Sequence, residues 1–511
     1  MRSTIWKTGI WTAAASAAAL TMSATGALAQ TTSAQAEEIA NALKRYIDER
    51  ILEPTPDLSL NLDGAIEVYP RGDHYAGIIP AGELVVSSDH DDVTVVFQFA
   101  DPLTFEIRID ERGWYDTTYV VPSSMRLNVY EGGREPLEGD PSASATFRIG
   151  DQSGWALIVP EYETAIASEG YLADMSFQVD DMPGDFSLAR FTYSQDSEEV
   201  DEGIFDSTFT ADASGFLISV PVEDVLVEIG NIGLFGAGTG LNFPALVDFN
   251  TALNELIIAS EEGADEIALM EDARTLLAET PPLMSDFQAT YFLEGLVVRS
   301  PDGNFDLTGA VAGGSLTGLD SELASISLNL DIEGLALDPA PPFANLLPES
   351  TGYLIEIADI PTDALLTWID NVLRDIPVMG EDSAFDQHML PLYFEIAERG
   401  TALNVEDLYY HSDAGSLEFT GQMRPNPGAL LGLTATAELV GTNLANLISA
   451  MGSIPDFDSE AAAGFALIQG LGAQTTNSDG EPVHTYLFEV TDDGSVTLNG
   501  NDFGPLIEQL Q

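Results

Sequence analysis

Apolar residues along the chain predict one helix near the start and then a long run of strands. They recur at helical spacing between Ala36 and Leu52, where Pro54 follows. From Leu58 to about Val227 apolar and polar residues mostly alternate, and Gly, Asp and Pro interrupt the alternation. A period of two is typical of antiparallel strands with one wet face. The clearest strands are expected at residues 61–69, 93–99, 104–109 and 124–130.

The middle of the chain is rich in glycine. Five glycines lie between Gly230 and Gly240, inside a segment, 225–247, whose single charged residue is Glu228. Their spacing does not match a dinucleotide-binding loop. Two interpretations remain open: a flexible hinge between two lobes, or an apolar flap that touches a hydrophobic ligand or a membrane.

Two amphipathic helices are expected after this segment, over residues 245–260 and 264–279. Each should bury one stripe of apolar side chains in a core. The first stripe is Leu246, Phe249, Leu253 and Leu256, and the second is Ile267, Met270, Ala273 and Leu277.

A strand–turn–strand pattern occurs three times in the C-terminal part. Residues 295–309, 407–421 and 486–500 align without gaps, and each copy has a turn glycine at the same offset. The turn glycines, Gly303, Gly415 and Gly494, are expected to adopt the positive φ that a tight bend requires. The copies are unequally spaced, which argues against a regular solenoid or propeller. Helices expected at 362–374 and 442–451 would cover the apolar face of the sheet.

These elements predict a β-rich α+β protein with one or more large twisted antiparallel sheets and a few covering helices. The expected organisation has four parts. They are a signal peptide at 1–29, an N-terminal β-rich lobe at 30–229, a Gly-rich hinge with a helical pair at 230–282, and a C-terminal lobe of repeated hairpins at 283–511.

The first 29 residues have the pattern of a cleaved export signal. Basic residues at Arg2 and Lys7 precede an apolar stretch. Ala27-Leu28-Ala29 then forms an A-x-A motif, after which cleavage is expected. We therefore expect a mature protein that starts at Gln30 and resides in the periplasm, with no membrane-spanning segment after cleavage. The chain has no Cys, which excludes disulfides, a thiol nucleophile and zinc–thiolate sites.

Acidic residues outnumber basic ones by 84 to 17, and the formal net charge is −67. Such a surface repels phosphate backbones, so nucleic acid is excluded as a partner. Apolar residues still make up 45% of the chain, enough for a folded core. The charge favours adaptation to a saline habitat over a cation-buffering role, because the acidic turns at 89–92 and 477–481 lack the ligand pattern of a calcium loop.

No catalytic constellation stands out. Residues 314–318 have Leu at the centre, where the hydrolase elbow has Ser. The five histidines, at 74, 90, 388, 411 and 484, are scattered; His411 and His484 are expected at the surface, and no metal or cofactor is expected. Trp114, Tyr115 and Tyr119 form an aromatic cluster for which two uses remain open, packing within a strand face or stacking on a sugar or an apolar ligand.

The order of parts resembles a family of exported alphaproteobacterial proteins filed as domain of unknown function twenty-one twenty-five. More loosely, the hairpins at Gly303, Gly415 and Gly494 are similar to those of the AsmA-like group of envelope proteins. That second resemblance implies curved sheets with an apolar inner surface and a link to lipid traffic. The chain departs from that group because it lacks a retained membrane helix.

The function expected from these features is that of an exported envelope protein without catalytic activity. It would bind a lipid, or another hydrophobic or protein partner, on an apolar sheet face. Two alternatives remain open: a structural or assembly protein of the envelope, and a hydrolase that uses Asp or Glu.

Overall fold

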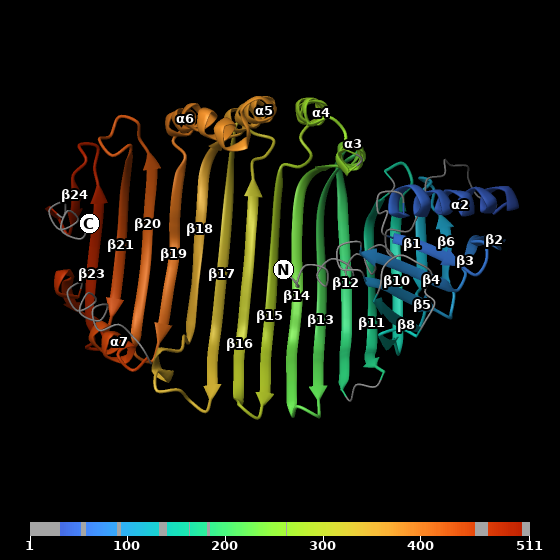
Figure 1. The fold of residues 1–511 in the computed structure, drawn as a ribbon, viewed down its shortest axis with the longest axis horizontal. Coiled ribbons are helices and arrows are strands. Elements are labelled where there is room, and N and C mark those ends of the chain that lie inside the picture. The colour runs from blue at the N-terminus through green and yellow to red at the C-terminus, as the bar shows by residue number, and fades with distance from the viewer. Residues whose placement is uncertain are drawn as a thin grey trace. The chain divides into compact units, whose positions relative to one another are not determined.

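The computed structural model describes residues 31–52, 58–88, 93–131, 140–162, 164–180, 184–261, 263–454 and 469–502. The expected signal peptide, the expected mature start at Gln30 and the acidic turn at 89–92 lie outside these residues. The protein is a β-rich α+β protein, as predicted, and its strands pair antiparallel (Figure 1). By its internal contacts the chain divides into two compact units. Unit 1 is Met1–Phe235 with Leu241–Asn250, and unit 2 is Gly236–Gly240 with Thr251–Gln511.

The elements of the N-terminal half are, in order, α2 (Ser33–Tyr46), the π-helix η1 (Ile47–Leu52), β1 (Leu58–Leu62), β2 (Glu67–Arg71), β3 (His74–Ile79), β4 (Gly82–Ser88), β5 (Val93–Phe99), β6 (Leu103–Ile109), β7 (Tyr115–Val120), β8 (Ser124–Glu131), β9 (Ala143–Arg148), β10 (Asp151–Val159), β11 (Thr164–Val179), β12 (Asp185–Asp201), β13 (Ile204–Val220) and β14 (Val225–Asn242).

The remaining elements are α3 (Phe243–Glu261), α4 (Glu266–Glu279), β15 (Asp286–Ser300), β16 (Gly303–Thr317), β17 (Leu323–Asp338), the 3-10 turn η2 (Ala344–Leu346), β18 (Ser350–Pro361), α5 (Thr362–Met379), α6 (Glu381–Arg399), β19 (Ala402–Ser412), β20 (Gly415–Pro425), β21 (Leu433–Thr442), α7 (Leu444–Met451), β22 (Ala473–Thr476), β23 (Pro482–Val490), β24 (Val496–Leu498) and β25 (Asn501–Asp502).

Unit 1 has a forked sheet. The first part of β11 pairs with β10, and the last part pairs with β9. One branch continues from β10 through β7, β6, β3 and β2. The other continues from β9 through β8, β5, β4 and β1. On its other side β11 pairs with β12, which pairs with β13.

Helix α2 packs on the first branch and forms the main core of unit 1. Thr32 caps the helix, because its hydroxyl accepts a hydrogen bond from the amide of Gln35. Ile39 and Leu43 are fully buried against Ile107 and Tyr115. The apolar stripe predicted between Ala36 and Leu52 therefore packs on the sheet.

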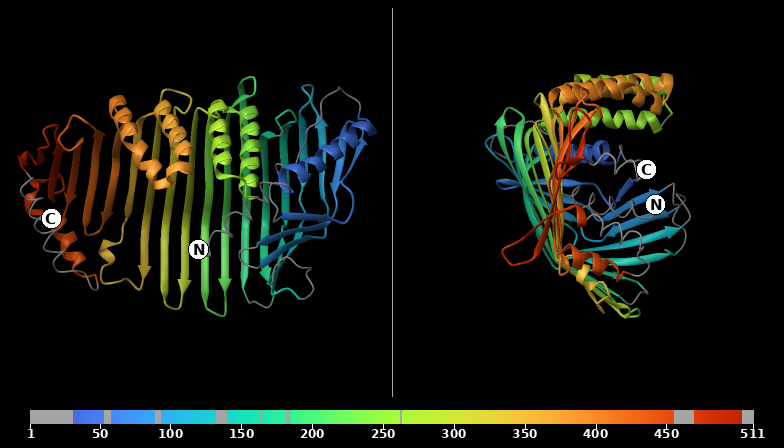
Figure 2. Two further views of the ribbon diagram at one scale, coloured as in Figure 1. Left: turned by 45° about the horizontal axis from the view of Figure 1, so that its top comes forward. Right: turned by 90° about the vertical axis from the view of Figure 1, so that its left-hand side faces the viewer.

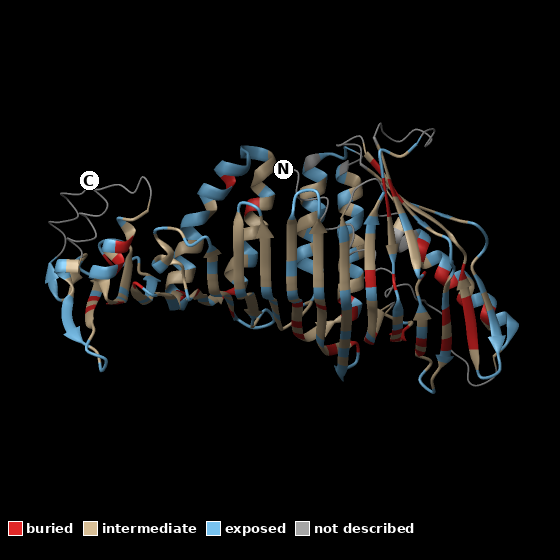
Figure 3. Cartoon of the chain, turned by 90° about the horizontal axis from the view of Figure 1, so that it is seen from below, coloured by how far each residue is buried: buried red, intermediate tan, exposed pale blue. Residues whose placement is uncertain are grey.

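Unit 2 is a meander. Strands β15 to β21 pair each with the next in sequence order, and β23 follows β21. Helices α5 and α6 are inserted between β18 and β19, and α7 follows β21. Figure 3 shows few buried positions along the strands of this unit, where most residues are half-buried or exposed.

The three glycines of the repeated hairpins lie at bends. Gly303 (φ 148°) pairs with Ser300, and Gly415 (φ 152°) pairs with Ser412, so each closes a two-residue turn. Gly494 (φ 78°) lies in the longer connection between β23 and β24, where its amide donates to the carbonyl of Thr491. Each hairpin copy therefore supplies two neighbouring strands.

Two predictions need correction, one about a strand and one about the Gly-rich segment. Residues 61–69 are not one strand, because β1 ends at Leu62 and β2 begins at Glu67; an Asp-Gly pair between them favours a bend. The Gly-rich segment Gly230–Gly240 is not a loop, because it belongs to the continuous strand β14; its expected role as a hinge or a ligand-contacting flap stays a prediction. The chain passes between the two units after Phe235 and after Gly240, both in β14, and again after Asn250 in α3. Glycine content alone was a poor indicator of a loop.

The helices occur where the spacing predicts them, but several predicted buried stripes are wrong. Leu253 of α3 and Ile267 and Leu277 of α4 are exposed. Helix α4 packs mainly against α5, and its apolar residues are only partly covered. Helix α6, which contains Pro391, was not predicted. Within the described residues no helix combines the length and hydropathy needed to cross a bilayer.

The core under α2 gives a stability prediction. Leu43→Ala should lower the free energy of unfolding by about 2–5 kcal/mol, because Leu43 is fully buried and the shortened side chain leaves a cavity. Urea unfolding followed by circular dichroism measures the change. The control is Lys44→Ala, which removes only an exposed ion pair with Asp48 and should cost about 0.5 kcal/mol or less. Equal losses in the two variants would contradict the packing of α2.

Candidate apolar ligand-binding surface

The strand register of unit 2 shows which side chains share a face of its sheet. In an antiparallel pair, residues directly opposite each other project from the same face. The register from β15 through β21 to β23 is defined for every neighbouring pair. The side chains can therefore be followed in rows that run across eight strands.

Four adjacent rows make up one face, which we call the apolar face. The first row is Phe287, Leu316, Ile326, Ile357, Leu403, Met423, Ala435 and Val490. The second is Ala289, Gly314, Leu328, Ile355, Val405, Gly421, Ala437 and Phe488. The third is Tyr291, Ala312, Leu330, Tyr353, Leu408, Phe419, Leu439 and Tyr486. The fourth is Leu293, Ala310, Ile332, Thr351, Tyr410, Leu417, Gly441 and His484.

No position of the apolar face holds Asp, Glu, Lys or Arg. The opposite face carries the polar residues that alternate with these rows, among them Asn329, Asp331, Glu356, Glu418 and Glu438. A two-sided sheet of this kind is expected to have its apolar side covered. Charge is therefore separated from apolar surface across the thickness of one sheet.

Part of the apolar face is open to solvent: seven of its 32 residues are exposed, and 21 are half-buried. Tyr291 is 58% exposed, Leu328 is 55% exposed and Leu408 is 40% exposed. With a rise of ~3.3 Å per residue and ~4.8 Å between strands, four rows on eight strands span roughly 20 Å by 34 Å. The largest apolar patch on a typical soluble monomer is ~300–600 Å², so a face of this extent is characteristic of an interaction surface.

Helices border the apolar face at both ends of the strands. At one end α7 and η2 cover part of the fourth row, where Leu447 packs with Tyr410 and Leu417. At the other end lie α5 and α6. The right-hand view of Figure 2 shows α5, α6 and α7 projecting to the same side of the sheet of unit 2. The middle rows lie between these two borders.

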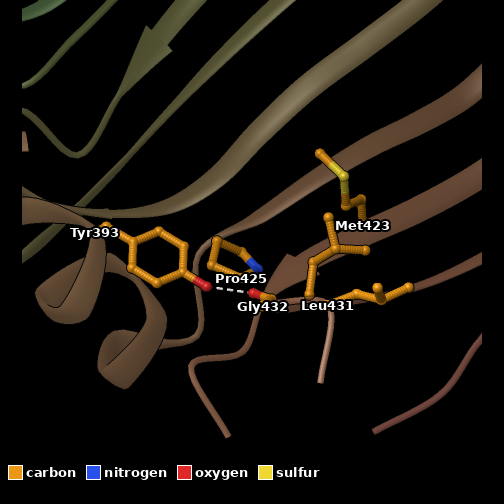
Figure 4. A pocket seen from close by; sticks show the side chains of 6 residues that line it. Tyr393, Met423, Pro425, Leu431 and Gly432 are labelled. Atoms are coloured by element: carbon orange, nitrogen blue, oxygen red, sulfur yellow. Dashed lines mark hydrogen bonds between the residues drawn. The ribbon is translucent and has the colours of Figure 1, made fainter. Parts of the chain in front are cut away.

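A shallow pocket of about 370 Å³ continues the apolar face under α6. It is lined by Tyr393 of α6, by Met423 of the first row, and by Pro425, Leu431, Gly432 and Leu433 (Figure 4). The hydroxyl of Tyr393 donates a hydrogen bond to the carbonyl of Gly432. Because this bond satisfies the only side-chain polar group in the lining, the pocket offers its other surfaces as apolar contacts.

A polar contact joins α5 to α6. The Asp375 carboxylate accepts a hydrogen bond from Arg374 Nε at 3.0 Å and lies 2.8 Å from His388 Nε2. These two bonds, that from Arg374 being the larger influence, lower the pKa of the Asp375 carboxyl below its usual value. The contact between Asp375 and His388 joins the two helices of the hairpin that borders the apolar face.

The residues singled out from the sequence do not converge on a site. Tyr115 is fully buried in the core under α2, Tyr119 packs against that core, and Trp114 packs in a neighbouring cluster, so strand-face packing accounts for all three. His388 contacts Asp375, and His411 lies 3.3 Å from Glu418. His484 is 5% exposed, which corrects the expectation of a surface imidazole; it belongs to the fourth row, where α7 and its neighbours cover the sheet.

The described residues offer no metal-binding arrangement. No group of three or more His, Asp or Glu side chains among them could hold a metal ion. In the turn at 477–481 the Glu481 carboxylate is bonded to Asn443 and Asn477. Folding lowers the pKa of four carboxyls, those of Asp73, Asp110, Asp375 and Asp493. A general acid instead needs a raised pKa.

An apolar sheet face was expected from the sequence, but the residues that compose it were not identified. Its signal is the alternation of residues 324–332, in which Ala, Ile and Leu alternate with Ser, Asn and Asp. That pattern predicts a strand with one apolar side. It does not show which strands lie beside it.

In comparisons with protein-family models, with curated proteins and with solved structures, the chain has no match. Both resemblances described above therefore stay predictions.

The contact between α5 and α6 gives a pH-dependent prediction. A carboxyl whose pKa is lowered on folding stabilises the fold above its unfolded pKa of about 3.9, and this stabilisation is lost as the pH falls through the folded value. Asp375→Asn should therefore lower the melting temperature at pH 7, and the difference from the unchanged protein should shrink at pH 3. The control is Asp386→Asn on the exposed side of α6. An equal shift at both pH values would show that the charge of Asp375 has no role.

Proposed function

We propose that this protein is an exported envelope protein that binds a lipid, or another ligand with long hydrocarbon chains, on the apolar face of unit 2. One observation carries the proposal: 32 neighbouring positions without Asp, Glu, Lys or Arg form one face, on which only four residues are buried and seven are exposed. Each 100 Å² of such surface removed from water contributes about 2.5 kcal/mol to binding.

The chemistry of the apolar face suits hydrocarbon better than extended peptide. A peptide laid flat on the face would bring its amide groups against Leu, Ile and Phe side chains, where they find few partners. An unpaired buried amide costs about 1–3 kcal/mol. A hydrocarbon chain has no such groups, and each methylene buried contributes about 0.8 kcal/mol.

The dimensions agree with this choice. An acyl chain spans half of a bilayer whose hydrocarbon core is ~30 Å thick, so it is ~15 Å long. The apolar face measures ~20 Å along its strands and ~34 Å across them. Several chains therefore fit side by side.

Nothing on the described surface favours the two alternative functions. A carboxylate-dependent hydrolase needs an acid and a base about 5–10 Å apart around a substrate, with the acid's pKa raised. A purely structural protein has no need for an open face of this extent, whose exposure to water is unfavourable.

The first test asks whether ligand is bound. Protein purified without detergent should carry hydrocarbon-chain molecules, detected by native mass spectrometry and by solvent extraction. After delipidation, it should bind a fluorescent fatty acid. Leu328→Asn and Leu408→Asn should each weaken that binding about tenfold or more, since each removes roughly 1.5–3 kcal/mol of apolar contact.

The matched control is Thr436→Asn, which places the same side chain on the opposite, polar face of the sheet. It should bind like the unchanged protein. The same loss in all three variants would point to a folding defect. Repeated absence of any bound hydrocarbon chain, together with no uptake of the fatty acid, would refute the proposal.

The expected export has a separate test. When the full chain is expressed in a Gram-negative host and cells are fractionated, the protein should be recovered from the periplasm. Its N-terminal residue, determined by mass spectrometry, should be Gln30. Recovery in the cytoplasm with residues 1–29 still attached would contradict this part of the proposal.

A further inference from the structure

We infer that the ligand of the apolar face is a two-chained lipid whose head group carries no net negative charge. This inference rests on the proposed function and adds the class of lipid. It is argued from the cations of unit 2, from its helix N-termini and from the charge of the chain.

Protein sites for anionic head groups use Arg or Lys side chains, or the free amides of a helix N-terminus. Between residues 251 and 511 the chain has no Lys and five Arg. Three of these guanidinium groups are held by carboxylates of the chain itself: Arg274 by Asp370 at 2.8 Å, Arg299 by Asp306 at 2.6 Å and Arg374 by Asp375 at 3.0 Å.

Arg399, the fourth, is the cation at the α6 border of the apolar face. It lies at the end of α6, 3.6 Å from Asp363 and 3.8 Å from Glu322. Glu322 immediately precedes β17, whose Ile326 belongs to the first row. Arg399 is thus between two carboxylates, which compete with any phosphate that approaches.

The fifth, Arg424, projects away from the apolar face. It follows Met423 in β20, and successive residues of a strand point to opposite faces. Since Met423 belongs to the first row, Arg424 lies on the polar side. None of the five guanidinium groups is therefore an uncompensated cation at the apolar face.

The N-termini of α5 and α6 are also unsuited to anions. Helix α5 has Asp363 in its first turn, and α6 has Glu381 and Asp382. These carboxylates occupy the positive end of each helix dipole, where a phosphate would otherwise bind. Helix α7 has no acidic residue in its first turn, but Asn443 at its N-cap donates a hydrogen bond to the Glu481 carboxylate. Together with the net charge of −67, the borders oppose an anionic head group.

The number of chains follows from the extent of the face. One acyl chain of ~15 Å leaves most of a surface of roughly 20 Å by 34 Å in contact with water. A two-chained lipid covers more of it with the same single head group. Such a lipid with a zwitterionic or uncharged head places its chains on the face without bringing a net anion near the acidic borders.

The test uses lipids that share their acyl chains and differ only in the head group. Delipidated full-length protein is incubated with vesicles of equal parts phosphatidylethanolamine and phosphatidylglycerol, recovered, and extracted for quantification. At low salt the bound lipid should favour the zwitterionic head by about tenfold. In about 1 M salt, where the Debye length is ~3 Å, the ratio of bound zwitterionic to bound anionic lipid should fall towards one.

A second measurement changes the borders. Glu322→Gln with Asp363→Asn frees Arg399 from both carboxylates. It should raise the share of the anionic lipid at least threefold without changing the uptake of an uncharged fluorescent fatty alcohol. As a control, Glu333→Gln with Glu438→Gln removes two negative charges from the polar face. It should leave the share of the anionic lipid unchanged.

The outcomes separate the two proposals. Equal binding of both lipids at low salt, with fatty-acid uptake intact, overturns the head-group inference and leaves the proposed function standing. Capture of a single-chain fatty acid or an amphipathic helix in place of the lipid also overturns it. No binding of any hydrocarbon chain defeats the proposed function and this inference together.

Discussion

The separation of apolar and charged side chains on the two faces of one sheet is the constraint on which the structure of unit 2 depends. Successive residues of a strand point to opposite faces, so a sheet with one apolar face needs apolar residues at every second position. Unit 2 keeps this alternation in step across eight strands, including a bulge at Val405 and Leu408. A one-residue slip of β17, for example, would place Asp331 and Glu333 among apolar side chains, which fixes the register strongly.

Unit 1 and unit 2 are built from the same kind of strand, but their apolar sheet faces are covered to different extents. In unit 1 the helix α2 covers a branch of the sheet and buries Ile39 and Leu43 completely. In unit 2 the helices lie at the ends of the strands, so Leu328 and Tyr291 remain more than half exposed. The contrast between a covered and an uncovered face is what distinguishes a core from a surface available to a ligand.

The sequence predicted the antiparallel strands and the hairpins at Gly303, Gly415 and Gly494 because their signals are local: alternation along a strand and a glycine at a bend. It failed where the outcome depends on a distant partner. The stripe on α4 looks amphipathic, yet Ile267 is exposed because the helix packs on α5. His484 reads as a surface residue of a strand, but its burial is decided by what packs on its row. The extent of the apolar face likewise requires the pairing of all eight strands.

The repeated hairpins give the sheet of unit 2 a simple way to change size. Each copy brings two adjacent strands joined by a short bend, and its neighbours contact only its outer edges. Duplicating such a segment would widen the sheet by ~10 Å and preserve the alternation of faces, whereas deleting one would narrow it by the same step. The capacity of this surface could thus have been adjusted during evolution in whole hairpins, with no redesign of the strands already present.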